Sequence, residues 1–567
     1  MRRRKLVPRP LPKDGGDLPP RLHPVLARIY LARGIRRAEE LDYTLKRLPP
    51  PGALSGIEAM TERLAAAIER DEAILVVADY DADGATACAL AVSGLRALGA
   101  RRVDFIVPDR FRLGYGLTPG LVREALARRP DVLLTVDNGI ASLQGVAAAK
   151  EAGLDVLITD HHLPGEALPE ADAIVNPNLP EDAFPSKALA GVGVMFYVLI
   201  ALRAKLRARG RAAEVNLADW LDLVALGTVA DVVPLDAVNR ILVHQGLERM
   251  RRGRLRPGIR ALLEAAGRSL ADLVASDLAF AAGPRLNAAG RLDDMTAGIR
   301  CLLSDDLREA RTLAARLDAL NRERRDIEAQ MQAEALRILD SRDWEDGSAA
   351  ICLYDPGWHE GVVGILASRI KDRTGRPVIA FAPGEDGLLK GSARSVPGLH
   401  IRDVLAAIDA ARPELIARYG GHAMAAGLSL APENLDRFAA AFEAQVAAAG
   451  IAADEVLVTD GTLEPPQFSL NLAETLRRAG PWGQAFPEPL FHGDFSVRQA
   501  RIVGERHLKL TVVPPGGPAL DAIAFNLDDP AAWLDCAQLR LAYQLDVNEF
   551  RGRRSVQLKV DYLEPLQ

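Results

Sequence analysis

The sequence contains three closely spaced aspartates that directly follow a hydrophobic segment. Asp79, Asp81 and Asp83 alternate with other residues after the apolar run 74–78. Calcium-binding loops share this alternation, but they need a preceding helix and a glutamate at the twelfth position, which here is Leu90. Asp83 alone could simply cap a helix. Three carboxylates at one strand end repel one another unless a positive charge offsets them, so the pattern favours a metal site.

Further acidic and imidazole side chains follow later apolar runs. They are Asp137, Asp160, His161, His162 and Asp231. Because the carboxyl ends of parallel strands meet at one edge of a sheet, we expect these side chains to converge with the three aspartates. Oxygen ligands combined with imidazoles suit Mn²⁺ or Mg²⁺. Two such ions that share a bridging carboxylate act on phosphate esters.

The elements that must position these residues follow an alternating pattern. Between residues 57 and 235, short runs rich in β-branched residues alternate with helical segments, which predicts a parallel sheet. The strands are expected at 73–78, 103–107, 132–136, 156–159 and 173–175. Residues 194–340 read as mainly helical, and 304–340, without proline or glycine, predicts one long bridging helix.

The rest of the chain predicts two further folded parts. Strands are expected at 349–354 and 377–382 in an α/β region, and at 508–513, 540–547 and 555–560 in a C-terminal β-barrel of the kind that binds oligonucleotides. The fold class is therefore α/β with a C-terminal barrel. The expected domains are an N-terminal arm (1–56), a sheet domain (57–303), a connecting helix (304–342), a smaller α/β domain (343–452) and the barrel domain (453–567).

Composition limits the function classes. The 567 residues are 49% hydrophobic and 26% charged, which is typical of globular proteins. The net charge of −6 means that a nucleic-acid partner would require positive charge gathered in a groove. The four cysteines form no metal-binding spacing, and prolines follow the basic N-terminus where a signal peptide would be apolar. No apolar run spans about 18 residues. We therefore expect a cytoplasmic protein without membrane contact.

Taken together, these motifs resemble those of the DHH phosphoesterase superfamily in order and spacing. Residues 420–427 are similar to the GGHxxAAG motif of the DHH-associated domain. Residues 283–291, 358–365 and 545–552 resemble signatures of the superfamily's bacterial exonucleases, which degrade single-stranded DNA in the 5′→3′ direction. The resemblance covers about residues 20–565. It implies a DHH domain, a DHH-associated domain and an OB-fold barrel.

The resemblance also implies two bound ions, Mn²⁺ or Mg²⁺, and their ligands. Asp83, Asp137, His161 and Asp231 would hold one ion, and Asp81 with the bridging Asp137 would hold the other. His162 would contact the scissile phosphate, and Asp160 would orient the histidine pair. Asp79 would support the ligands without binding an ion. A ligand position found in the superfamily's small phosphatases is Val77 here.

Residues that contact nucleic acid are implied in the same way. Arg110, Ser392 and Arg394 would bind the 5′ end of the strand, and Arg285 and Arg291 would line its path. Tyr115, His359 and His422 would complete this set, although a lone histidine such as His422 is more often structural. The basic cluster formed by Arg251, Arg252, Arg254 and Arg256 could equally be a DNA contact or a solvated face.

The expected function is a metal-dependent 5′→3′ exonuclease that degrades single-stranded DNA to mononucleotides in DNA repair and recombination. An alternative is a phosphodiesterase for short oligonucleotides or cyclic dinucleotides, which would not need a barrel and an arm. A third possibility is a catalytically inactive scaffold. Such a protein would have lost metal ligands, whereas every ligand position of the second ion is present here. The expected partners are single-stranded DNA with a 5′ end, a single-strand-binding protein and a helicase, and the chain is expected to be monomeric.

Overall fold

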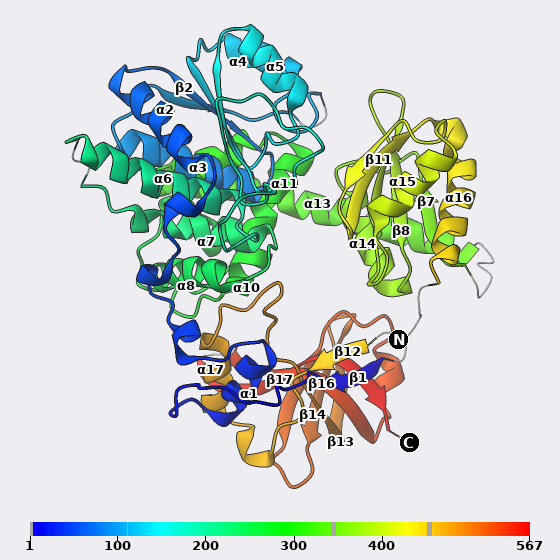
Figure 1. Ribbon diagram of the computed structural model, residues 1–567. Helices are drawn as coiled ribbons and strands as arrows, with labels where there is room; N and C mark the ends of the chain where they lie inside the picture. The colour runs from blue at the N-terminus through cyan, green and yellow to red at the C-terminus, as the bar shows by residue number, and fades with distance from the viewer. Residues whose placement is uncertain are drawn as a thin grey trace. The chain divides into compact units, whose positions relative to one another are not determined.

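The structure is a computed structural model that describes residues 4–109, 112–211, 214–341, 348–450, 456–550 and 552–566. The chain divides into two compact units (Figure 1). The first comprises Met1–Leu286, Met295–Ala315 and Val456–Gln567, and the second comprises Asn287–Asp294 and Arg316–Glu455. Among the residues that the structure describes, no helix is both long enough and apolar enough to span a bilayer.

A five-stranded parallel sheet forms the centre of the first unit. Its strand order is β3-β2-β4-β5-β6. The bounds are β2 (Ile74–Ala78), β3 (Val103–Ile106), β4 (Val132–Val136), β5 (Asp155–Thr159) and β6 (Ala173–Val175), which confirms all five predicted strands. Every residue of β2 and β4 is buried, as expected for central strands covered on both faces.

Helices cover both faces of this sheet. On one face, α4 (Pro119–Leu126) and α5 (Leu143–Glu151) pack on apolar side chains of β2, β4 and β5. On the other face lie α3 (Ala82–Ala97) and α6 (Gly191–Ala208), while α2 (Ile57–Glu69) packs on β6 and α6. The chain leaves β2 toward β3 on one side and returns to β4 on the other. In such sheets the crevice at this reversal, outside the carboxyl ends of the strands, is where ligands bind.

The helical region after the sheet was predicted correctly. It contains α7 (Leu221–Ala230), α8 (Ala237–Arg251), α9 (Pro257–Ala265), α10 (Ala275–Asp277), a π-helical turn (Leu278–Ala282), α11 (Gly283–Leu292) and α12 (Thr296–Leu303). The long helix α13 (Leu307–Ser341) has 35 residues, and the boundary between the two units falls within it. This confirms the bridging helix.

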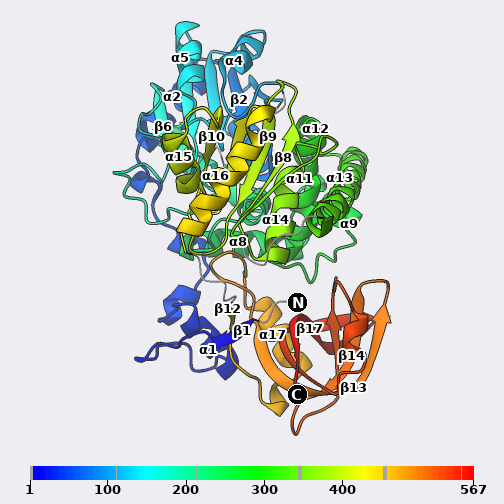
Figure 2. The ribbon, with the colours of Figure 1, turned by 90° about the vertical axis from the view of Figure 1, so that its right-hand side faces the viewer.

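The second unit contains a five-stranded mixed sheet with the order β10-β11-β9-β8-β7 (Figure 2). The bounds are β7 (Ile351–Tyr354), β8 (Val378–Pro383), β9 (Leu389–Arg394), β10 (Arg418–Gly421) and β11 (Ala425–Leu430). One face packs on α15 (Ile401–Ala411) and α16 (Leu435–Ala448), and the other on α14 (Val363–Thr374) and α13. The sequence prediction missed β9, β10 and β11, because their glycines and charged residues do not form an apolar alternation.

The C-terminal strands close into a barrel in the order β13-β14-β15-β17-β16. The bounds are β13 (Phe491–Val503), β14 (His507–Val513), β15 (Leu520–Ala524), β16 (Gln538–Phe550) and β17 (Arg553–Pro565), preceded by α17 (Leu470–Arg478). A closed barrel of five strands with one parallel pair, β15 and β17, is the architecture of an OB-fold. The predicted barrel is confirmed.

The N-terminal arm packs against the segment that leads into the barrel. Strand β1 (Lys5–Pro8) pairs in parallel with β12 (Val456–Thr459). The helix α1 (Pro24–Ala32) carries Tyr30, whose hydroxyl donates to the Ala479 carbonyl at 2.7 Å. Next to it, the guanidinium of Arg33 forms a bidentate pair with the carboxylate of Asp460, at 2.7 and 2.9 Å. The arm is therefore an integral part of the first unit.

Candidate active site

The loop after β2 places two aspartates at the carboxyl edge of the sheet. Asp79 follows the strand, and its Oδ1 accepts a hydrogen bond from the Tyr80 amide at 2.7 Å. Asp81 is the N-cap of α3, and its Oδ1 accepts from the Gly84 amide at 2.9 Å. Position 84 must be glycine, because an added Cβ would lie 2.6 Å from the Asp79 carbonyl oxygen. The tight turn into α3 therefore holds the carboxylates of Asp79 and Asp81 close to each other.

The loop after β4 contributes Asp137 in a strained backbone conformation. Its φ of 63° lies in the left-handed region, which a non-glycine residue rarely adopts. Its amide donates to the Thr159 carbonyl at 3.0 Å, and Gly191 lies so close that a Cβ there would be 2.6 Å from Oδ1 of Asp137. Asn138 donates to the Val77 carbonyl at 3.0 Å and thereby ties this loop to β2. Strain of this kind is typical of functional positions.

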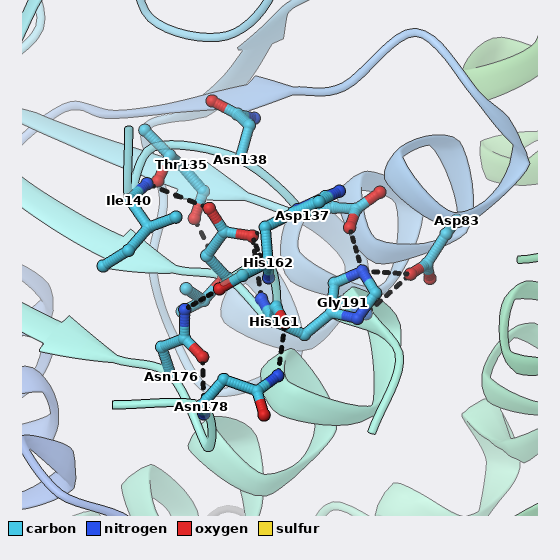
Figure 3. Close-up of polar contacts among 12 residues, drawn as sticks. Asp83, Thr135, Asp137, Asn138, Ile140, His161, His162, Asn176, Asn178 and Gly191 are labelled. Carbon is cyan, nitrogen blue, oxygen red and sulfur yellow. Dashed lines mark hydrogen bonds and ion pairs between the residues drawn. The ribbon is translucent and has the colours of Figure 1, made fainter. Parts of the chain in front are cut away.

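The loop after β5 contributes two neighbouring histidines, His161 and His162 (Figure 3). Asp160 accepts hydrogen bonds from the amides of Ile140 at 2.9 Å, His161 at 2.7 Å and His162 at 3.1 Å. Its Oδ1 also lies 2.7 Å from Nδ1 of His162. Asn176 donates to the His162 carbonyl at 2.9 Å. The predicted orienting role of Asp160 is consistent with these contacts, which hold the imidazole of His162 and the backbone of His161.

Three carboxylates surround one nitrogen of His161. Its Nε2 lies 3.0 Å from Oδ1 of Asp137, 3.5 Å from Oδ2 of Asp231 and 3.9 Å from Oδ2 of Asp83. Asp231 is the residue that ends α7, and Asp83 lies in the first turn of α3. The structure thus brings together the four residues that the resemblance implies for the first ion.

A second group of carboxylates lies on the other side of Asp137. Single oxygen atoms of Asp79, Asp81 and Asp137 all lie within 4.8 Å of one another. Sequence analysis gave Asp79 only a supporting role, but its carboxylate lies as close to this group as that of Asp81. The alternation of the three aspartates was the signal for it. Val77, in contrast, is buried in the strand interior and contributes no ligand atom.

The electrostatics of the cluster fit divalent cations. Burial and then the charge of Asp81 raise the pKa of Asp83 to about 7. Burial and neighbouring carboxylates also raise the pKa values of Asp79, Asp137 and Asp231. Oδ1 of Asp137 is buried and accepts no hydrogen bond from the described residues. An uncompensated set of buried carboxylates is costly, and two divalent cations between them would supply the missing charge.

Tyr115 borders this cluster with its hydroxyl end. Its Oη lies 3.4 Å from the Asp137 carbonyl oxygen and 3.4 Å from each ring nitrogen of His162. Burial of the hydroxyl and the surrounding carboxylates raise its pKa, so the phenol keeps its proton. The side chain is also accessible, since the residue is 44% exposed. Tyr115 is therefore available to a ligand that approaches the carboxylates.

A separate anion cradle lies in the second unit. Arg394 and Ser392, both on β9, approach Gly364 in the first turn of α14. A Cβ at position 364 would lie 2.8 Å from Nη2 of Arg394 and 3.1 Å from Oγ of Ser392. Nε of Arg394 donates to Oγ of Ser368 at 3.1 Å, and burial lowers the pKa of the guanidinium. A guanidinium, a hydroxyl and a helix N-terminus at one glycine are suited to bind phosphate.

The remaining predicted contacts have local roles in the structure. Nη1 of Arg285 donates to the Ala281 carbonyl at 2.7 Å, and Nη1 of Arg291 donates to the Gly361 carbonyl at 3.2 Å. Nδ1 of His359 accepts from the Gly361 amide at 3.0 Å. His422 lies in the exposed turn between β10 and β11. Arg110 lies outside the described residues.

The structure bears on the open question of the basic cluster. Arg251 and Arg252 form ion pairs with Glu248 at 2.8 and 3.2 Å. Arg256 lies 3.6 Å from the buried carboxylate of Asp222, which also accepts a hydrogen bond from the Arg256 amide. Three of the four arginines therefore have acidic neighbours within the same unit, which favours an intramolecular role.

A parallel sheet with two adjoining carboxylate groups at its point of strand reversal defines a DHH-type phosphoesterase. Three family models match the chain accordingly: the N-terminal domain of the DHH family over residues 73–228, the DHHA1 domain over 346–448 and the RecJ OB domain over 459–562. This combination of domains and the relatives described next show that the chain belongs to the RecJ family.

Curated relatives are similar over almost the entire chain. The single-stranded-DNA-specific exonuclease RecJ of Dickeya dadantii is 55% identical, with 97% of each chain covered. That of Escherichia coli is 53% identical, with 98% of each chain covered. Crystal structures of RecJ from Thermus thermophilus match as well. The complex with Mn²⁺ has a TM-score of 0.81 and 32% identity, and covers all of this chain and 80% of that one. The complex with Mg²⁺ has a TM-score of 0.76 and 31% identity, and covers all of this chain and 79% of that one.

Proposed function

We propose that this chain is a metal-dependent exonuclease that degrades single-stranded DNA from its 5′ end to mononucleotides, in DNA repair and recombination. The observation that carries the proposal is the pair of carboxylate groups that share Asp137, on a chain of the RecJ family. One ion would bind to Asp83, Asp137, His161 and Asp231. The other would bind to Asp81, Asp137 and Asp79. When bound, the two cations would activate a water molecule for attack and neutralise charge on the phosphoryl oxygens.

The chain's own side chains prepare the scissile phosphate. His162 is held by Asp160 through the contact between Nδ1 and Oδ1 at 2.7 Å, and the charges around it raise its pKa to about 9 against the opposing effect of burial. A protonated imidazole would donate to a phosphoryl oxygen from its other nitrogen. The hydroxyl of Tyr115, next to His162, is a second donor for the same phosphate. Both donors are preorganised, which favours a charged transition state.

The cradle at Gly364 supports recognition of the 5′ end. A terminal phosphate carries up to two negative charges, and Arg394 and Ser392 provide charge-assisted and neutral donors for it. Arg110 is a further candidate for this end, and Arg285, Arg291, His359 and His422 are candidates for contacts along the strand. Cleavage from the end that this cradle binds would release mononucleotides in the 5′→3′ direction.

The partners, the oligomeric state and the cellular location that we propose all rest on this exonuclease activity. A strand with a free 5′ end arises where a helicase separates a duplex, and a single-strand-binding protein would cover it. We therefore infer a helicase and a single-strand-binding protein as partners of a monomeric enzyme. Because its proposed substrate is cellular DNA, we infer that the enzyme works in the cytoplasm.

A digestion assay with end-labelled strands tests the proposal. Strands of several lengths, labelled at the 5′ or the 3′ end, are incubated with the full chain and Mn²⁺ or Mg²⁺. We expect early release of the 5′ label as mononucleotide and none when the metal is chelated. Asp81→Ala should abolish release, whereas Asp104→Ala, an exposed aspartate of the same sheet, should not. Cleavage confined to dinucleotides would favour the alternative phosphodiesterase, and early loss of the 3′ label would exclude the polarity.

A further inference from the structure

A cavity of about 310 Å³ lies in the first unit between the N-terminal arm and the segment that enters the barrel. The arm contributes Arg9 and, from α1, Arg28, while the other wall contains Gly461, Thr462 and His492. In Figure 1, α1 and β1 accordingly lie beside β12 and the barrel strands. The cavity shares no residue with the carboxylate groups or with the cradle at Gly364.

Arg9 lacks a dedicated counter-ion. Its Nε lies 3.9 Å from Oδ1 of Asp460, but both oxygens of that carboxylate already accept hydrogen bonds from Arg33. The side chains of Arg33 and Asp460 are only 1% and 2% exposed, so this ion pair is buried, although Asp460 lines the cavity. Nε of Arg9 is buried without an acceptor among the described residues. Burial and the charge of Arg33 lower the pKa of Arg9, and the charge of Asp460 partly opposes them.

Arg28 adds a second cation to the same cavity. Its Nη2 donates to the Thr462 carbonyl at 2.9 Å, and its Nε is buried without an acceptor among the described residues. The guanidinium lies against Gly461, where an added Cβ would be 3.7 Å from Cζ. No carboxylate among the described residues forms an ion pair with Arg28. Two guanidiniums from different segments thus line one cavity that has a single carboxylate, which Arg33 occupies.

A second cavity of about 400 Å³ adjoins the first, since Thr462 and His492 line both. Phe468, Phe495 and Tyr543 form part of its wall. Tyr543 is fully buried, and its hydroxyl has no hydrogen-bond partner among the described residues. A buried hydroxyl without a partner is costly unless a ligand or water satisfies it. The second cavity therefore offers aromatic rings and the Tyr543 hydroxyl next to the two arginines, and the ion-paired Asp494 and Arg540 also line it.

We propose that the two cavities bind a nucleotide, with its phosphate between Arg9 and Arg28 and its organic part against the wall that contains Tyr543. A tetrahedral phosphate can accept hydrogen bonds from guanidiniums that approach from two sides, whereas a carboxylate offers only two oxygens in one plane. The residues of the site lie on β13 and β16 and on the arm. OB-folds generally bind oligonucleotides on the face of their second and third strands, here β14 and β15, so this site is a different one.

The nucleotide has two possible sources. It is either one nucleotide of a bound single strand, in which case the inference rests on the proposed function, or a free nucleoside monophosphate. The test uses the full chain without divalent metal and with Arg394→Ala as background, which removes the cradle at Gly364. Inorganic phosphate and deoxyadenosine monophosphate are titrated by calorimetry, and sodium acetate at equal ionic strength is the reference anion.

We expect the background chain to bind one phosphate, and Arg9→Gln and Arg28→Gln each to weaken this binding at least 10-fold. Tyr543→Phe should weaken binding of the nucleotide but not of inorganic phosphate. Arg21→Gln, an exposed arginine of the same arm, should change neither. If Arg28→Gln is too unstable to be assayed, the variants Arg9→Gln and Tyr543→Phe still test the proposal. Unchanged affinities in these variants, or equal competition by acetate, would overturn the proposal.

A salt titration separates the two sources. Binding of a 30-nucleotide oligothymidine is measured between 50 and 300 mM salt, and each lost phosphate contact should reduce the slope of log K against log salt by about 0.7. A reduced slope in Arg9→Gln identifies the strand as the source, and an unchanged slope with lost nucleotide binding identifies the free nucleotide. Nuclease activity of the unmodified chain is measured in parallel, so failure of the proposed function is seen independently.

Discussion

Arg394→Ala should abolish the enzyme's preference for a 5′ phosphate over a 5′ hydroxyl. The guanidinium is fixed by two hydrogen bonds, from Nε to Oγ of Ser368 at 3.1 Å and from Nη1 to the Ala393 carbonyl at 2.8 Å. The third nitrogen of the guanidinium, Nη2, is directed at the space above Gly364. A Cβ added to Gly364 would lie 2.8 Å from this nitrogen. That nitrogen is the donor that a terminal phosphate would meet.

The magnitude follows from this geometry. A charge-assisted hydrogen bond contributes about 1.5–3 kcal/mol. At about 1.4 kcal/mol per factor of ten, the loss of one such bond lowers kcat/KM on a phosphorylated end roughly 10- to 150-fold. Because no carboxylate among the described residues pairs with Arg394, a bound phosphate would supply its only counter-charge. The effect should therefore lie in the upper part of that range.

The assay compares four reactions: the unmodified chain and Arg394→Ala, each on strands with a 5′ phosphate and with a 5′ hydroxyl. Both changes delete the same contact, so the two losses should not add: Arg394→Ala should slow the strand with a 5′ phosphate, leave the strand with a 5′ hydroxyl nearly unaffected, and so degrade both at similar rates. Arg412→Ala, an exposed arginine of the same domain, is the matched control. Additive losses, or an unchanged phosphate preference in Arg394→Ala, would refute the assignment of the cradle to the 5′ end.

Three further predictions concern other parts of the chain. Asp137→Ala should lose both ions and nearly all turnover, whereas Asp81→Ala should retain one ion; metal analysis of the purified variants measures this. Cleavage by Asp137→Ala at the normal rate would exclude two ions that share this ligand. Gly364→Ala should reduce the preference for a 5′ phosphate without removing a charge, because the new methyl group fills the cradle; the same comparison of phosphate and hydroxyl ends measures it. Asp460→Ala should lower the free energy of unfolding by about 3–5 kcal/mol, measured by denaturant titration, because it leaves Arg33 buried without a counter-ion; a loss below about 1 kcal/mol would contradict this.

Much of the fold could be predicted from the sequence, because its strongest signals are local. The central strands β2 and β4 are almost entirely apolar, and a strand buried on both faces needs no other pattern. The long helix lacks proline and glycine over its whole length, which leaves no local reason for it to end. The sites at strand ends followed from the same signal, because acidic residues directly after buried strands must lie at one edge of a parallel sheet.

The tertiary structure decided what depends on contacts between distant segments. The alternation of the three aspartates brought Asp79 to attention, but only the turn into α3 decides that its carboxylate lies as close to Asp137 as that of Asp81 does. The strands β9 to β11 are stabilised by their neighbours rather than by their own residues, so their glycine-rich sequences read as loops.

Closeness in space also created features that no motif encodes. Gly364 and Arg394 lie 30 residues apart in the chain, and only the packing of α14 on β9 joins them into one cradle. Arg9 and His492 come from opposite ends of the chain, and the pairing of β1 with β12 brings them to one cavity. The sequence alone determined the residue types available for chemistry and the order of the buried elements. Which side chains share a site was decided by long-range packing, because burial and hydrogen bonding act between segments regardless of their separation in the chain.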